Sequence, residues 1–565
     1  MAGTPHGQAF ASNRPVVMAR KGMVSSGHPL ASQAGITMLQ RGGNAVDAAL
    51  AVATAISVVE PLMSGIGGDG FIMVYTKADD KLQVVNATGA APYAATLEKY
   101  QASGIPMKGI LSVSVPSLLK GWTEVHARYG TLSLSEVMQP ALDLAANGFP
   151  VSHLLAKNIA SDPLICEFPT SAAVYARAGR PIRAGEILYQ ENLAKTYEKI
   201  LRQGDGVFYE GEVGHAIVKF FEEQGGLLSM KDLADHHVRW QEPISTSYRG
   251  HRVYEAPPNS SGHVLLQALN LAEQFDLRSL GANSLEAIHM MVEAKRMAFA
   301  DREAYMADPE WVEVPIPGLL SKEYAAERAK GIDVERAAAQ VAAGDPWRYQ
   351  DGAKPNGTAR VSAAKEDTTC FAVVDQWGNA VSMLQSIQSA FGSSVIAGDT
   401  GVLLNNRMTY WHLDPNHIDV LEPGKRVRHT MNPVMAFREG ADGKRELALV
   451  CGTPGADTQV QTNFQVVTHV LDFGMTVAEA VEAPRWRHVQ DGTESTVPHA
   501  ATDELRMEGR FPADVTDALK KRGHPVTLLQ DWEAAGSEVM IQVDPDTGVL
   551  SGAADPRRDG YAIGW

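Results

Sequence analysis

Two hydroxyl-bearing residues, Thr368 and Ser386, have types and spacing that could support chemistry together. The runs 368–375 and 380–387 alternate as strands do, and the residues between them have the composition of a hairpin turn. If the strands pair directly around this turn, the antiparallel register places Thr368 opposite Ser386. A hydroxyl beside a second hydrogen-bonding group is a candidate nucleophile. Thr is also common in strands for structural reasons, so the spacing alone leaves both interpretations open.

The predicted secondary structure around these hydroxyls changes from mainly helical to strand-rich at residues 367/368. Before this point the region 117–310 has mainly helical periodicity, and a stretch from about 337 to 366 has no sustained periodicity and is interpreted as a connector. After it, short alternating strands predominate. The predicted helices are 48–59 (capped by Asn44 and Asp47), 134–146, 194–202, 285–302, 461–471 and 477–483, and the predicted strands include 71–75 and 447–451.

A glycine-rich loop at 65–70 matches the dinucleotide-binding pattern G-x-G-x-x-G. In that motif a strand precedes the loop and a helix follows it, whereas here a helix precedes it and a strand follows. We therefore interpret it as a tight turn beside a site. The sequence predicts no nucleotide and no other cofactor.

The bulk composition excludes several classes of protein. The 565 residues have a formal net charge of −16, which argues against a nucleic-acid partner. Three scattered cysteines (Cys166, Cys370 and Cys451) predict buried small side chains in a reducing compartment, with neither a metal cluster nor a disulfide framework. The most apolar run is too short to span a membrane and the first twenty residues have no apolar core, so we expect a cytoplasmic protein.

The segment that contains Thr368 closely resembles the catalytic segment of the γ-glutamyltransferase-like family of N-terminal-nucleophile (Ntn) hydrolases. Other motifs match in the same order along nearly the whole chain. The matching segments are 41–48, 65–70, 113–116, 257–262, 367–369, 373–375, 378–381, 391–393, 398, 401–406, 452–455 and 555–557. The resemblance implies an α+β fold, the αββα four-layer sandwich, with a large outer helical region.

The resemblance also implies self-cleavage between Asp367 and Thr368. The products would be a large subunit, 1–367, mostly helical with one part of the sandwich, and a small subunit, 368–565, which begins with the nucleophile. Cleavage creates an α-amine on Thr368, and its ordinary pKa of about 7.7–8.0 suits a base at neutral pH. In the family pattern Ser386 orients the nucleophile. Gly455 and Ala456 match the pair whose backbone N–H groups form the oxyanion hole.

The substrate-binding positions depart from those of true γ-glutamyl enzymes. The Arg that would hold the glutamyl carboxylate is Thr88, and the Asp that would hold the ammonium is Tyr410. The remaining positions of this set are Gln388, Arg407, His429 and Thr430. Both ends of a glutamyl group have lost their charged partners, so γ-glutamyl donors are expected to bind poorly.

The segments 385–387, 406–407, 421–426 and 429–433 resemble instead the amidohydrolase-type branch of the family, which includes oxamate amidohydrolase and some cephalosporin-acylase-like proteins. We expect an amide hydrolase whose small substrate carries a carboxylate, bound by Arg407 and His429. The alternative interpretation of those two residues is a structural Arg–acid pair and a surface histidine. The alternative functions are a γ-glutamyl hydrolase or transpeptidase, a cephalosporin-type acylase, and an uncleaved binding protein. The expected partners are the substrate and the two subunits of one precursor; a homo-oligomer is compatible with the sequence, and no metal is expected.

Overall fold

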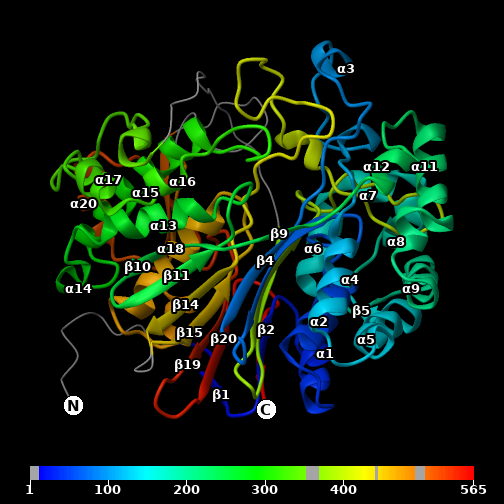
Figure 1. Ribbon diagram of the computed structural model, residues 1–565, viewed down its shortest axis with the longest axis horizontal. Coiled ribbons are helices and arrows are strands. Elements are labelled where there is room, and N and C mark those ends of the chain that lie inside the picture. The colour runs from blue at the N-terminus through cyan, green and yellow to red at the C-terminus, as the bar shows by residue number, and fades with distance from the viewer. Residues whose placement is uncertain (1–11, 352–367, 440–442, 490–502) are drawn as a thin grey trace.

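Two seven-stranded antiparallel sheets stack at the centre of the molecule, and helices cover both outer faces (Figure 1). The computed structural model describes residues 12–351, 368–439, 443–489 and 503–565. The site sheet has the order β21 (Tyr561–Gly564), β2 (Met23–Ser26), β12 (Thr369–Val374), β13 (Ala380–Ser386), β3 (Asp69–Thr76), β4 (Lys81–Ala87) and β9 (Arg239–Gln241). The second sheet has the order β1 (Val17–Ala19), β20 (Leu550–Ala554), β19 (Val539–Val543), β15 (Arg445–Gly452), β14 (Val434–Glu439), β11 (His251–Glu255) and β10 (Ile244–Tyr248).

The two sheets enclose a buried apolar layer. It includes Phe71 and Cys370 from the site sheet and Val450 and Ile541 from the second sheet. Successive strand residues point to opposite faces, so the alternate residues of these strands pack against the helices. Cys370 and Cys451 are buried and unbridged, as the sequence predicts, while Cys166 is half-buried and also free.

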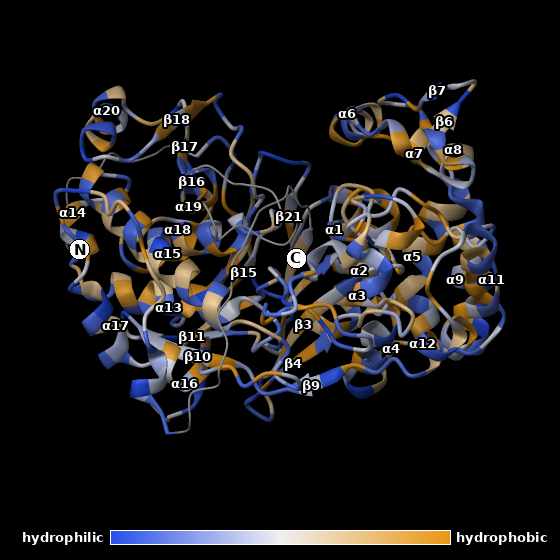
Figure 2. Cartoon of the chain, turned by 90° about the horizontal axis from the view of Figure 1, so that it is seen from above, coloured by the Kyte–Doolittle hydropathy of each residue, from blue (hydrophilic) through white to orange (hydrophobic). Residues whose placement is uncertain are grey.

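The helices form one layer on each side of the stacked sheets (Figure 2). The site sheet is covered by α1 (Pro29–Gln40), α2 (Ala45–Val59), α4 (Leu118–Tyr129) and α5 (Leu134–Asn147). The second sheet is covered by α13 (Gly262–Ala272), α15 (Leu285–Tyr305), α18 (Thr458–Leu471) and α19 (Val477–Glu482). Asn44 caps α2 through a capping box with Asp47, which confirms the predicted start of this fully buried helix. The αββα sandwich is therefore confirmed.

The region 117–310 is less purely helical than expected. It supplies β9, β10 and β11, so part of it lies inside the sandwich and only the rest packs outside. The β10–β11 hairpin is local and turns at 249–250, so the sequence analysis missed a short-range pairing there, whereas β9 and β11 also pair with β4 and β14 from segments far away in the sequence. The connector predicted at 337–366 contains a 3₁₀ turn at Pro346–Tyr349, and its part from 352 onward lies outside the described residues.

Smaller elements complete the outer layers. The remaining helices are α3 (Leu97–Gln101), α6 (His153–Ser161), α7 (Pro163–Glu167), α8 (Pro169–Tyr175), α9 (Glu191–Gln203), α10 (Gly206–Tyr209), α11 (Glu212–Gln224), α12 (Met230–Ala234), α14 (Leu277–Leu280), α16 (Ile316–Leu319), α17 (Lys322–Ala329) and α20 (Ala513–Lys521). The remaining strands are β5 (Phe149–Pro150), β6 (Ala176–Arg177), β7 (Arg180–Pro181), β8 (Ile187–Leu188), β16 (Trp486–Val489), β17 (Glu504–Glu508) and β18 (Val526–Leu529). Within the described ranges no helix combines the length and the apolar character needed to cross a bilayer.

Candidate active site

The β12–β13 hairpin brings the two predicted hydroxyls together. Thr369 pairs with Gln385 and Val374 pairs with Ala380, so the predicted register is confirmed. Thr368 precedes β12, and its Oγ1 donates a hydrogen bond to Ser386 Oγ at 3.3 Å. Both residues are buried. The contact that the sequence predicted from hairpin register is therefore present.

This pair begins a row of four residues across the end of the site sheet. Ser386 lies opposite Asp69 of β3, and the β3–β4 register, in which Gly70 faces Ala87, places Thr88 next in line. Residues opposite one another on neighbouring strands share a face of the sheet and lie about 4.8 Å apart in the hydrogen-bonding direction. Thr368, Ser386, Asp69 and Thr88 thus form one polar row, which we call the site row.

The glycine-rich loop at 65–70 shapes the approach to this row. A Cβ on Gly68 would lie 2.2 Å from the carbonyl oxygen of Ser386, and one on Gly67 would lie 2.2 Å from that of Leu403. No side chain fits at either distance, so both positions require glycine. The loop is a close backbone contact that supports the end of β13, in agreement with its interpretation as a turn beside a site.

Gly455 and Ala456 lie in the loop between β15 and α18, shortly before Gln459, whose side chain contacts Thr368. Both have positive φ, +119° and +53°, and the value for Ala456 is unusual for a residue with a side chain. Gln459, in the first turn of α18, places its Nε2 3.4 Å from Thr368 Oγ1 and 3.3 Å from Thr430 Oγ1. We call residues 453–457 the oxyanion loop, because backbone N–H groups at this position suit a developing oxyanion.

Arg407 is paired with Asp69 in the site row. Its Nε and Nη2 donate to the two carboxylate oxygens at 3.0 and 2.9 Å, and both side chains are buried. Burial raises the pKa of Asp69, while Arg407 opposes that shift. The Arg407 guanidinium also lies over the ring of Tyr410, 4.7 Å from its centroid. The structural Arg–acid pair considered in the sequence analysis is therefore present.

His429 is fully buried, so the interpretation as a surface histidine is wrong. Its Nε2 lies 3.6 Å from Asp69 Oδ2, and its ring stacks on Tyr410 with the centroids 6.2 Å apart. Burial, reinforced by the charge of Arg407, holds the pKa of His429 well below its usual value, so the ring is neutral at physiological pH. Backbone hydrogen bonds with Asn259 and Ser261 hold this histidine inside, where its ring packs edge-on against Phe71 of β3.

The other predicted binding residues also surround the site row. The Tyr410 hydroxyl lies 3.5 Å from Thr430 Oγ1, and the Gln388 backbone N–H donates to Ser386 Oγ at 2.8 Å. Thr88 donates to Asn86 Oδ1 at 2.6 Å and accepts from Asn259 at 3.3 Å. Thr88 thus joins a side-chain hydrogen-bond network at the position where the family pattern has an Arg, and Arg426 Nη1 reaches the same Asn86 Oδ1 at 3.4 Å. Asp367, the other predicted cleavage residue, lies outside the described residues.

Sequence reasoning missed Gln459, which contacts the Thr368 hydroxyl, and it also missed Asp69. Asp69 lies within the glycine-rich loop motif and begins a buried strand, which is a signal that the sequence contains. Its partnership with Arg407 joins positions more than three hundred residues apart, and only the fold reveals it.

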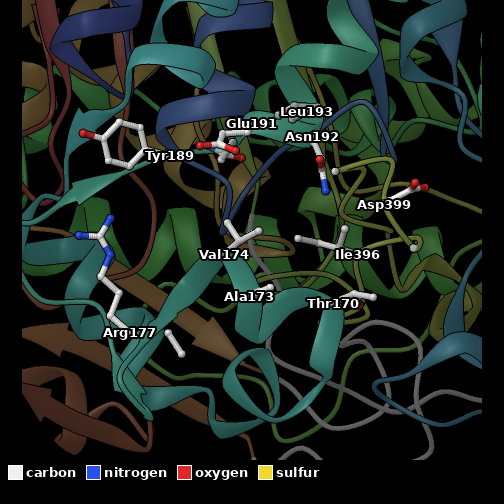
Figure 3. Close-up of a pocket in the computed structure, with 14 residues that line it drawn as sticks. Thr170, Ala173, Val174, Arg177, Tyr189, Glu191, Asn192, Leu193, Ile396 and Asp399 are labelled. Carbon is white, nitrogen blue, oxygen red and sulfur yellow. The ribbon is translucent and has the colours of Figure 1, made fainter.

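A cavity lies away from the site row. It has a volume of about 620 Å³ and opens between α8, the start of α9 and the turn at 396–401, with Arg177, Tyr189, Glu191, Asn192 and Asp399 around it (Figure 3). None of the predicted site residues lines it. Across the described parts of the chain no group of His, Cys, Asp and Glu side chains has the arrangement of a metal site.

Fold and site together define an Ntn hydrolase: an αββα sandwich with a hydroxyl residue at the start of a central strand. The family model for gamma-glutamyltranspeptidase matches residues 31–565. The chain therefore belongs to the gamma-glutamyltranspeptidase family, and it is a proenzyme of the Ntn class.

The relatives differ in the activity that their names state. The chain is 38% identical to the glutathione hydrolase-like YwrD proenzyme of Bacillus subtilis over 97% of this chain and 99% of that one. It is 32% identical to the oxamate amidohydrolase proenzyme of Klebsiella pneumoniae, covering 96% and 98% of the two chains. The crystal structure of cephalosporin acylase from Bacillus halodurans superposes with a TM-score of 0.87 and 36% identity, covering 100% of this chain and 99% of that one.

Proposed function

We propose that the chain cleaves itself between Asp367 and Thr368 and that the mature enzyme hydrolyses a small amide whose acyl part bears a carboxylate. The observation that carries the proposal is the site row. It begins with the hydroxyl pair and includes Asp69, which forms a buried ion pair with Arg407, and position 88 has a Thr in place of the family's Arg. Oxamate is the leading substrate.

In maturation, the Thr368 hydroxyl attacks the Asp367 carbonyl and the peptide bond becomes an ester. Water then hydrolyses the ester and leaves a free amine on Thr368. In turnover, this amine takes the hydroxyl proton as Thr368 Oγ1 attacks the substrate carbonyl, and the proton passes to the departing amine or ammonia. Ser386 accepts from the Thr368 hydroxyl before cleavage; once the amine takes that proton, Ser386 donates its own O–H to Thr368 Oγ1 and fixes its direction, while the N–H groups of Gly455 and Ala456 stabilise the oxyanion. Water completes the cycle by hydrolysing the acyl-enzyme.

The site has no charged partner for either end of a γ-glutamyl group at the two positions that the family uses. Thr88 and Tyr410 occupy those positions: the Thr88 hydroxyl donates to Asn86 Oδ1, and Tyr410 lies beside Thr430 with the Arg407 guanidinium over its ring. A charge-assisted hydrogen bond contributes about 1.5–3 kcal/mol, so two lost bonds cost roughly two to four powers of ten in efficiency. Such a loss is large enough to change the preferred substrate.

An acylase for longer acid side chains is the second candidate, favoured by the similarity to the cephalosporin acylase structure over the full chain. It shares the carboxylate-bearing acyl group and differs only in acyl length. Arg407 is the cation nearest the nucleophile among the predicted binding residues, through Asp69 in the site row.

One assay separates these candidates. Ammonia release by the cleaved enzyme is measured with oxamate, succinamate, glutaramate and glutamine; the last two differ only in the α-ammonium group. We expect oxamate to be the fastest, with glutaramate well above glutamine. A maximum at glutaramate supports the acylase instead. Faster turnover of glutamine or glutathione than of every other amide contradicts the proposed specificity, and turnover by Thr368→Ala contradicts the nucleophile.

A further inference from the structure

A buried charge cluster includes Asp457, the last residue of the oxyanion loop. It consists of Arg302 and Glu303 from α15, Asp457 at the start of α18, and Arg428. The Arg302 guanidinium contacts both carboxylate oxygens of Asp457, with Nη2 3.1 Å from Oδ2 and Nη1 closer still to Oδ1. The two side chains are 0% and 1% exposed. This two-point contact fixes both the position and the orientation of Asp457.

Asp457 does not cap its helix with its side chain, as an Asp at the start of a helix usually does. It is the N-cap residue of α18, yet its side chain makes no capping hydrogen bond to the helix. Its carboxylate turns to Arg302 instead. The preceding residue, Ala456, has a left-handed conformation that persists only when the surroundings enforce it. The Arg302 contact, one residue further on, is positioned to enforce it.

The cluster also reaches the opposite wall of the site. Glu303 Oε1 accepts from Arg302 at 2.6 and 2.9 Å and from Arg428 Nη1 at 3.2 Å. Arg428 immediately precedes His429 and Thr430 in the chain, and Gln459 connects Thr430 with Thr368. One buried network therefore contacts both the oxyanion loop and the segment that bears two predicted binding residues.

We propose that Arg302 is a positioning residue for catalysis: it holds Asp457, and thereby the N–H groups of Gly455 and Ala456 and the side chain of Gln459, around the Thr368 hydroxyl. This inference rests on the proposed function. Arg302 precedes the proposed cleavage point and Asp457 follows it, so in the mature enzyme the large subunit completes the oxyanion hole of the small one. Activity then depends on the two subunits staying together.

The test compares Arg302→Gln with a matched variant at the other end of the same helix. Arg249 Nε lies 2.7 Å from Asp472 Oδ1, and Asp472 is the C-cap residue that directly follows α18. Arg249→Gln therefore also removes an Arg–Asp pair that anchors α18, at a site one helix length from Thr368. Turnover of the best amide is measured per cleaved chain.

We expect Arg302→Gln to lower kcat about a hundredfold, as loss of one oxyanion donor does, with KM changed less than threefold. Arg302→Lys keeps the positive charge but loses the two-point guanidinium contact, so its kcat should lie between those of wild type and Arg302→Gln. Arg249→Gln should keep kcat within threefold of wild type. If Arg302→Gln does not fold, Arg302→Lys and the double variant Arg302→Gln, Asp457→Asn, which leaves no unpaired charge at Asp457, provide the same comparison.

A wild-type kcat in folded Arg302→Gln, an effect on KM alone, or an equal loss in Arg249→Gln overturns the proposal. Failure of the proposed function would give a different result, because it would appear as amide turnover by a Thr368→Ala variant that is otherwise unaltered.

Discussion

The pairing of Arg407 with Asp69 leads to a prediction that separates a structural role of Arg407 from a role in substrate binding. Arg407→Met leaves the Asp69 carboxylate buried without its cation. Breaking a buried ion pair on one side costs about 3–5 kcal/mol in the free energy of unfolding. The burial that already raises the pKa of Asp69 then acts without opposition from Arg407. We expect a loss of stability of that size by urea unfolding, followed by tryptophan fluorescence.

The double variant Asp69→Asn, Arg407→Met removes both charges and should recover most of that stability, because replacing a buried pair as a whole is often nearly neutral. Self-cleavage should persist, since it uses the hydroxyls and local backbone. If Arg407 also binds the substrate carboxylate, the recovered double variant still lacks one charge-assisted contact. That loss is about 1.5–3 kcal/mol, or one to two powers of ten in kcat/KM.

The assay is ammonia release from oxamate and from oxamide, its neutral counterpart of nearly the same shape. We expect the double variant to lose oxamate turnover selectively and to retain oxamide turnover. An unchanged oxamate-to-oxamide ratio in a stable double variant would refute the binding role and leave Arg407 as a purely structural partner of Asp69. Wild-type stability in Arg407→Met would refute the buried-pair reasoning itself.

Three further predictions concern the nucleophile, its partner and the core. Thr368→Ala should appear as one uncut chain on denaturing electrophoresis, whereas wild type gives two fragments; a cleaved variant contradicts the assignment. Ser386→Ala should lower kcat about tenfold, because Thr368 loses a hydrogen-bond partner and the Gln388 N–H loses its acceptor, while Ser386→Thr should stay near wild type; equal losses in both argue against an orienting hydroxyl. Burial raises the pKa of the Glu538 carboxyl to about 8, above its usual 4.5. The protonated carboxyl therefore makes its full contribution to the free energy of unfolding below pH 4.5, and this contribution is lost as the pH rises to about 8. The stability of Glu538→Gln relative to wild type should therefore rise by up to about 1.4 kcal/mol per pH unit between pH 5 and 8 in urea unfolding, and a constant difference contradicts this.

Local patterns in the sequence were sufficient for several features of the site. The hairpin register follows from alternation and a short turn, so the contact between Thr368 and Ser386 was predictable to the residue. The capping box of helix α2 is also local, since it joins residues three positions apart. The requirement for glycine at 67 and 68 is not local, because it comes from the carbonyl oxygens of Leu403 and Ser386, more than three hundred residues away. The motifs additionally identified the family and hence the sandwich.

The charge pairing of the site was decided by the tertiary structure alone. Asp69 and Arg407, or Arg302 and Asp457, lie far apart in sequence, and an isolated Arg gives no sign of which carboxylate it will meet. The local sequence around His429 does not indicate burial, yet backbone contacts with Asn259 and Ser261, far away in the sequence, place it in the interior. A sequence determines local periodicity and turn geometry directly. Burial and ion pairing depend on which distant segments come together, because the cost of removing a charge from water is set by everything that surrounds it.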